Sequence, residues 1–162
     1  MIDPRTPVVV GVGQSAERID DAGYRAMSPV QLAAAAAQAA LADCGADGVA
    51  AAIDAVVATR AFEISIPKAP APLGKSNNFP RSVARLIGAD PPRAVLDKVG
   101  GQGPQKLLTE FAGEIVAGTA DVVLLCGSDA TSTLRHFAKA DTKPDFTETV
   151  DQLTVIAEVK SD

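Results

Sequence analysis

The sequence is poor in the side chains that bind metals or form disulfides. It has one histidine and two cysteines in 162 residues. The cysteines, Cys44 and Cys126, lie far apart in the chain and lack the close spacing of metal ligands. We therefore expect no metal site, a buried thiol at each cysteine, and a reducing compartment, the cytoplasm.

Basic clusters and long apolar runs are also missing. The net charge is -5 and the isoelectric point is near 4.8, which argues against nucleic acid and anionic membranes as partners. At the amino terminus only Arg5 precedes a short apolar stretch at residues 8–12, and Gln38 interrupts the alanine-rich run at residues 32–42. Neither a signal peptide nor a membrane span is expected from these patterns.

What the sequence does contain is the balance of an ordinary globular domain, with 47% hydrophobic and 22% charged residues. Short apolar runs alternate with longer helical patterns. This alternation predicts a layered α/β domain with a mostly parallel sheet flanked by helices. We assign residues 1–134 to this domain and residues 135–162 to a polar loop or tail that contributes at most one edge strand.

Capping signals and periodicity place the individual elements. Ser28, Pro29 and Gln31 form a capping-box start for a helix that ends near Cys44, before Gly45. The other expected elements are strand 7–12, strand 55–59, helix 81–87, strand 94–99, a helix from Gly103 and Pro104 to Gly118, and strand 121–125.

Two of these regions carry further expectations. Residues 60–79 hold prolines, Gly74 and paired asparagines, which suit neither a helix nor a central strand, so we expect a functional loop or a dimer-crossing segment. Residues 121–125 are apolar on both sides of the strand alternation. That pattern predicts a central strand covered on both faces.

Three linked segments, residues 94–103, 114–118 and 120–129, resemble the thiolase superfamily in order and spacing. In that family the run has a cysteine after the strand, then a helix, a glycine, aspartate-valine-valine, and a glycine-rich turn with an acid. Residues 8–14 and 132–147 resemble the bacterial acetyl-CoA acetyltransferase-like, or sterol-carrier-type, branch. The resemblance covers only the amino-terminal half of the family's chain, so we expect a truncated arrangement.

The resemblance places Gly100 at the position of the nucleophilic cysteine. Thiolases use a thiolate at a helix amino terminus, together with histidines from the second half of the chain. Gly100 has no side chain, and the sole histidine, His136, lies in the polar segment. We therefore assign no catalytic residue and expect the isolated chain to be inactive in thiolysis.

The same turn keeps backbone groups that could bind a ligand. Gly101, Gln102 and Gly103 precede Pro104 at a helix start, where N–H groups can face a thioester or carboxylate oxygen. Asp129 matches the family's acidic turn position. The resemblance thus implies a coenzyme A thioester as ligand, bound near Gly101, Gln102, Gly103 and Asp129, and no covalently bound cofactor.

Each of these residues also has a simpler interpretation. Residues 100–103 suit a tight turn that allows close helix packing, and Asp129 suits a turn or a cap. Gln102 and His136 are typical of solvated surface side chains. Cys126 ends a predicted strand rather than starting a helix, which favours a buried structural thiol over a nucleophile.

A dinucleotide site is the remote alternative. Residues 11–16 fit a G-x-G-x-x-A pattern after a predicted strand. A phosphate-binding turn must lead directly into its helix, whereas the strong helix start at Ser28 comes too late. Asp20 and Asp21 would in addition repel phosphate.

Three functional classes follow. The first is a thiolase-like acyltransferase half, tied to lipid metabolism, that is active only with another polypeptide. The second is a non-catalytic subunit that binds acyl-CoA or serves assembly, including a lyase subunit that works with a partner. The third is a product without activity. The resemblance implies a homodimer, or a heteromer with another thiolase-like or accessory subunit, joined through the third strand.

Overall fold

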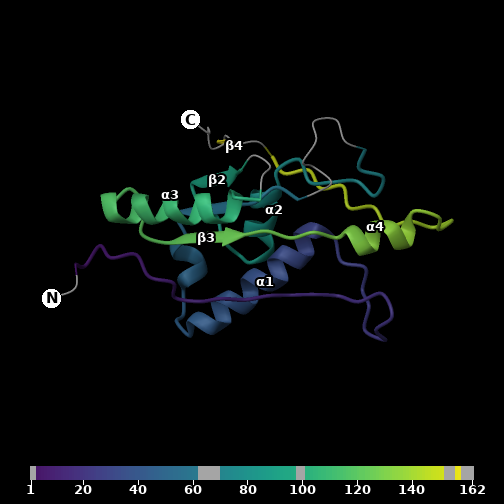
Figure 1. Ribbon diagram of the computed structural model, residues 1–162, viewed down its shortest axis with the longest axis horizontal. Helices are drawn as coiled ribbons and strands as arrows, with labels where there is room; N and C mark the ends of the chain where they lie inside the picture. The colour runs from purple at the N-terminus through teal and green to yellow at the C-terminus, as the bar shows by residue number, and fades with distance from the viewer. Residues whose placement is uncertain (1–2, 62–69, 98–100, 152–155, 158–162) are drawn as a thin grey trace.

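The protein is built around a parallel sheet with helices on both faces (Figure 1). The computed structural model describes residues 3–61, 70–97, 101–151 and 156–157. The strands are β1 (Ala55–Ala58), β2 (Arg93–Leu96), β3 (Val123–Cys126) and β4 (Ile156–Ala157), in the order β3-β1-β2-β4. The expected layered α/β architecture with a mostly parallel sheet is confirmed.

β1 occupies the centre of this sheet. Val56 lies opposite Ala94 of β2 and opposite Leu124 of β3, and both pairings are parallel. All four side chains of β1 are fully buried. Because helices cover both faces of a parallel sheet, a strand in this position is apolar at every residue.

One face of the sheet is covered by α1 (Pro29–Cys44) and α2 (Phe79–Leu86). Ser28 caps α1 as predicted: its hydroxyl accepts from the Gln31 N–H at 3.2 Å, and the Gln31 side chain accepts from the Ser28 N–H at 2.9 Å. Apolar residues of α1 and α2 pack together onto this face; they include Val30, Ala33, Ala34 and Ala37 of α1 and Phe79 and Val83 of α2.

The opposite face is covered by α3 (Gly103–Ala117). Its Leu107 and Phe111 pack onto Val57 and neighbouring residues of β1 and β2. Arg93 of β2 fixes the helix further, since its Nη2 donates to Glu114 Oε1 at 3.0 Å and its guanidinium lies 5.4 Å from the centre of the Phe111 ring. The sheet is therefore the middle layer between two helical layers.

Residues 7–12 were expected to form the first strand, and this expectation was wrong. The segment is extended but has no strand partner in the described residues. It lies on α1 instead: the Val12 N–H donates to Asp43 Oδ2 at 2.9 Å, and a Cβ on Gly13 would come within 2.3 Å of the Ala36 carbonyl oxygen. Glycine permits this close approach, so the segment stays beside the helix.

The expectation that residues 121–125 form a central strand was also wrong. β3 is the last strand in the sheet order of the described residues, and Leu125 is 37% exposed. Helices lie over both faces of β3, so its side chains alternate between two apolar layers. An apolar pattern therefore predicts that layers cover both faces of a strand, but it does not predict whether another strand pairs with each of its edges.

The remaining elements complete the outline. A short 3-10 helix covers Val49–Ala52, and α4 spans Thr131–Phe137, across the expected boundary at residue 134.

The described part of the long loop is hydrogen-bonded to a segment much later in the chain, since Asn77 Oδ1 accepts from the Val150 N–H at 2.9 Å. β4 pairs with the outer edge of β2, the strand that the resemblance assigns to dimerisation. No helix in the described ranges has the length and apolarity to cross a membrane.

Candidate functional site

The candidate site lies where the parallel strands β1, β2 and β3 end. Because these strands are parallel, their carboxyl ends meet at one edge of the sheet. In open α/β sheets, ligands bind outside this edge. Thr59 and Arg60 follow β1, Asp97 follows β2, and Gly127 follows β3.

Asp97 organises the centre of this edge. It is buried, and its N–H donates to the Ala58 carbonyl at 3.0 Å. Arg60 Nε donates to the Asp97 carbonyl oxygen at 3.1 Å, which joins the ends of β1 and β2. A Cβ on Gly103 would lie 2.9 Å from Asp97 Oδ2, so the start of α3 packs directly against this carboxylate.

α3 begins at this edge of the sheet. Gln102 is the N-cap residue, and no side chain of the described residues caps the helix. The first turn is closed by the Lys106 N–H, which donates to the Gln102 carbonyl at 2.9 Å, while Pro104 carries no N–H. The positive end of the helix dipole therefore points outward beside Gly101 and Gln102, which are both exposed.

The other predicted site residues are placed as follows. Gly100 lies outside the described residues, so the assignment of the nucleophile position stays a prediction. Asp129 follows β3, and its Oδ1 accepts from the Thr131 N–H and hydroxyl, both at 2.9 Å. It shares the carboxyl edge with Gly101, Gln102 and Gly103, but β1 lies between their strands. The structure therefore brings these residues to one edge without showing a contact between them.

His136 lies on α4, away from the strand ends. It is exposed, and its ring makes edge contacts with the rings of Tyr24 at 5.8 Å and Phe137 at 4.8 Å between centroids. The Tyr24 hydroxyl shares a hydrogen bond with Thr133 Oγ1 at 3.0 Å. In the part of the chain that the structure describes, no three His, Cys, Asp or Glu side chains lie in a group that could hold a metal ion.

Cys126 does not have the environment of a nucleophile. It packs against the apolar residues beneath α1 and α2. Burial raises the pKa of the Cys126 thiol to about 12, so the thiol is protonated at neutral pH. Both cysteines are free thiols.

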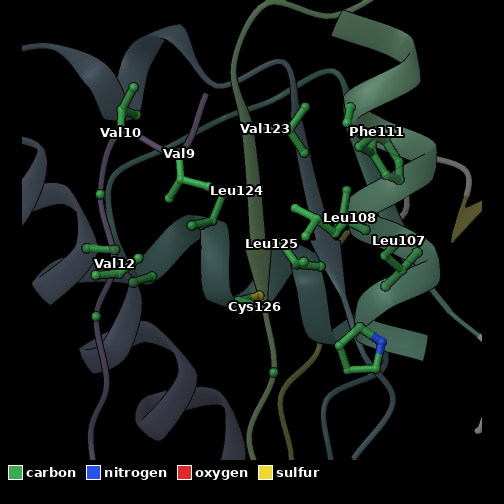
Figure 2. A pocket seen from close by; sticks show the side chains of 18 of the residues that line it. Val9, Val10, Val12, Leu107, Leu108, Phe111, Val123, Leu124, Leu125 and Cys126 are labelled. Carbon is green, nitrogen blue, oxygen red and sulfur yellow. The ribbon is translucent and has the colours of Figure 1, made fainter. Parts of the chain in front are cut away.

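Sequence reasoning missed Arg60 and Asp97. Both residues directly follow apolar strands, and a charged residue at the carboxyl end of a parallel strand is the signal that could have identified them. It also missed a groove of about 820 Å³ along β3 (Figure 2). Residues 7–13 line one side of this groove, and β3 and α3 line the other.

Comparisons with known proteins give a likeness among solved structures. No protein-family model matches the chain, and no curated protein matches it. Among solved structures, a monomeric SCP2-thiolase like protein type 1 from Mycobacterium smegmatis is 54% identical in sequence, with a TM-score of 0.62. The match covers 77% of this chain and 24% of that one, so this chain spans about a quarter of the neighbour's length. The fold is therefore thiolase-like.

Proposed function

We propose that this chain is the part of a thiolase-like protein that binds acyl-coenzyme A thioesters in the cytoplasm, and that it does not catalyse thiolysis by itself. One observation carries the proposal: no side chain of the described residues caps the start of α3, which lies at the carboxyl edge of a thiolase-like sheet. A helix start of this kind favours negative charge and polarised carbonyl oxygens.

Three residues would carry the binding. The backbone N–H groups of Gly101 and Gly103 and the side-chain amide of Gln102 would donate to the thioester oxygen. Asp97 holds this turn in place through its contact with Gly103. Asp129 would shape the neighbouring loop, since its carboxylate already accepts from Thr131.

The chemistry of thiolysis needs a group that this turn does not supply. Acyl transfer in thiolases requires a nucleophile that forms a covalent thioester with the acyl group. Gly100 has no side chain, and the Cys126 thiol is protonated at neutral pH because burial raises its pKa to about 12. A role in binding, with any catalysis supplied by another polypeptide, accounts for both facts.

Thermal unfolding with acetyl-CoA tests the proposal. At about a hundredfold excess over the dissociation constant, binding adds about 2.7 kcal/mol to the free energy of unfolding. For a domain of this size, that raises the unfolding midpoint by about 5 to 10 °C. Adenosine 3′,5′-bisphosphate, which lacks the thioester, should produce a smaller shift.

A matched pair of variants localises the site. Gln102→Ala removes one exposed donor and should weaken acetyl-CoA binding about fivefold, the value of one hydrogen bond. Gln105→Ala changes the same residue type three positions further along the first turn, where Gln105 Nε2 donates to Thr109 Oγ1, and should leave binding unchanged. An absent shift with wild-type protein, or equal losses in the two variants, would contradict this site.

A further inference from the structure

Asp97, which follows β2, is a charged residue in a buried position. It is 3% exposed, and an aspartate is rarely buried to this degree without a partner. Its backbone is bonded on both sides, since the N–H donates to the Ala58 carbonyl and the carbonyl accepts from Arg60 Nε. Its carboxylate is different: among the described residues, no group donates a hydrogen bond to it and no ion pair includes it. A buried carboxylate of this kind destabilises a fold, so we expect it to serve another purpose.

The carboxylate points at the start of α3. A Cβ built on Gly103 would lie 2.9 Å from Asp97 Oδ2, and Gly103 is the first residue of the helix. This is the helix start at which the thioester oxygen is proposed to bind, beside Gly101 and Gln102. A negative charge is therefore held directly behind the proposed binding turn.

Two opposite charges meet at this helix start. The dipole of a helix corresponds to about half an elementary positive charge at its first turn, whereas a carboxylate carries a full negative charge. The donors of this turn are also few, because Pro104 has no N–H and the Lys106 N–H is already donated to the Gln102 carbonyl. The charge of Asp97 therefore outweighs the attraction that the helix start alone would exert on an anion.

A thioester and a carboxylate respond differently to this charge. A thioester carbonyl is neutral, and its polarised oxygen can accept from backbone N–H groups without bringing a net charge. A carboxylate on the ligand brings a second negative charge close to the buried one, where like charges repel more strongly than in bulk water. The arrangement favours a neutral acceptor over an anionic one.

We propose, on the basis of the proposed function, that Asp97 is a specificity-determining residue that restricts the α3 site to coenzyme A thioesters with an uncharged acyl group. Acyl groups that carry a carboxylate close to the thioester, such as malonyl, are excluded by its charge. Asp97 needs no contact with the acyl group to do so. The burial of an unpartnered carboxylate then contributes selectivity and not stability.

Binding of malonyl-CoA and acetoacetyl-CoA to the full chain, measured by calorimetry, tests the proposal. The two acyl groups have the same length, and the carboxylate of the first stands where the second has a methyl ketone. We expect the wild-type chain to bind acetoacetyl-CoA at least about tenfold more tightly. The preference should persist in about 0.5 M sodium chloride, because salt screens a buried charge much less than it screens surface charges.

A matched pair of variants assigns the preference to one residue. Asp97→Asn removes the charge but keeps the shape of the side chain, and it should bind malonyl-CoA at least about fivefold more tightly than wild type does. Its affinity for acetoacetyl-CoA should change by less than about twofold, since that acyl group is neutral. Arg60 stays in place, so the comparison isolates the charge of Asp97. Asp47→Asn makes the same charge change at an exposed position and should leave both affinities unchanged.

Urea unfolding provides a second measurement that needs no ligand. Asp97→Asn should be at least as stable as wild type, because it removes a buried charge that has no partner among the described residues. A loss of stability in this variant would show that the carboxylate has a structural role and would overturn the proposal.

The binding results distinguish a failure of this inference from a failure of the function on which it rests. A wild-type chain that binds neither thioester would contradict the proposed function, and the role of Asp97 with it. Equal binding of the two thioesters by wild type, or an unchanged preference in Asp97→Asn, would overturn the role of Asp97 alone and leave acyl-CoA binding intact.

Discussion

The two sides of β1 differ in how completely the sheet is built. On the β2 side, strands pair in register and α3 seals the face through Leu107 and Phe111. On the β3 side, β3 pairs with β1 alone among the described residues, and an apolar groove lies between its other edge and residues 7–13. The difference shows that a layered domain can cover both faces of its sheet while one sheet edge has no strand partner in the described part of the chain.

The largest expected effect on stability tests this difference between the two sides at two adjacent leucines of α3. Leu107 is 0% exposed and packs onto β1 and β2, whereas Leu108 is 48% exposed and lines the groove. Leu107→Ala should lower the free energy of unfolding by about 2 to 5 kcal/mol, because it leaves a cavity in a closed core. Leu108→Ala should cost less than about 1 kcal/mol.

Urea unfolding of both variants measures this difference directly. If the two losses were equal, the β3 side would be as tightly packed as the β2 side, and the comparison would fail.

A smaller effect concerns the hydrogen bonds that join β1 to β3. Asp54 Oδ2 accepts from the Asp121 N–H at 2.7 Å and the Val122 N–H at 2.9 Å. These bonds lower the pKa of Asp54 below its ordinary value of 3.8. The carboxylate therefore stabilises the fold above the unfolded pKa, and this contribution is lost as pH falls through the lower folded pKa.

Asp54→Asn should remove that pH dependence. The variant should be less stable than wild type at pH 6, and the difference should shrink as the pH is lowered below 4. Asp47→Asn makes the same charge change at an exposed position and serves as control. Urea unfolding across this range measures the effect; a constant difference at all pH values would show that the charge of Asp54 contributes nothing.

Local signals predicted much of this fold. The capping box at Ser28 and Gln31 located the start of α1, and Gly103 with Pro104 located the start of α3. Both signals act within a few residues, so they can be read from the chain directly. Whether residues 7–12 pair with another strand could not be predicted in this way. A strand's neighbours are set by distant segments of the chain, and its apolar pattern depends only on the layers above and below the sheet.

The helix start beside the candidate site was predictable in the same way. Its turn at Gly101, Gln102 and Gly103 was placed correctly at a helix start, because glycine and proline mark such turns. The hydrogen bond from Arg60 to the Asp97 carbonyl joins residues 37 positions apart and has no local signature. Contacts of this kind appear only once the parallel strands are aligned.

The smallest expected effect concerns β3 itself and is the rate at which the Cys126 thiol is modified. Leu124 and Cys126 line the groove, and they also pack against buried residues of α1 and α2. Burial raises the pKa of the Cys126 thiol to about 12, so the reactive thiolate is scarce at pH 8.

In a Cys44→Ser background, iodoacetamide should therefore modify Cys126 slowly at pH 8, at least about tenfold more slowly than in concentrated urea, where the thiol has an ordinary pKa. Mass spectrometry of timed samples measures both rates. Rapid modification of the folded protein would mean that the groove gives the reagent access to the Cys126 thiol. Slow modification would mean that the packing of Cys126 beneath α1 and α2 excludes the reagent, although the residue lines the groove.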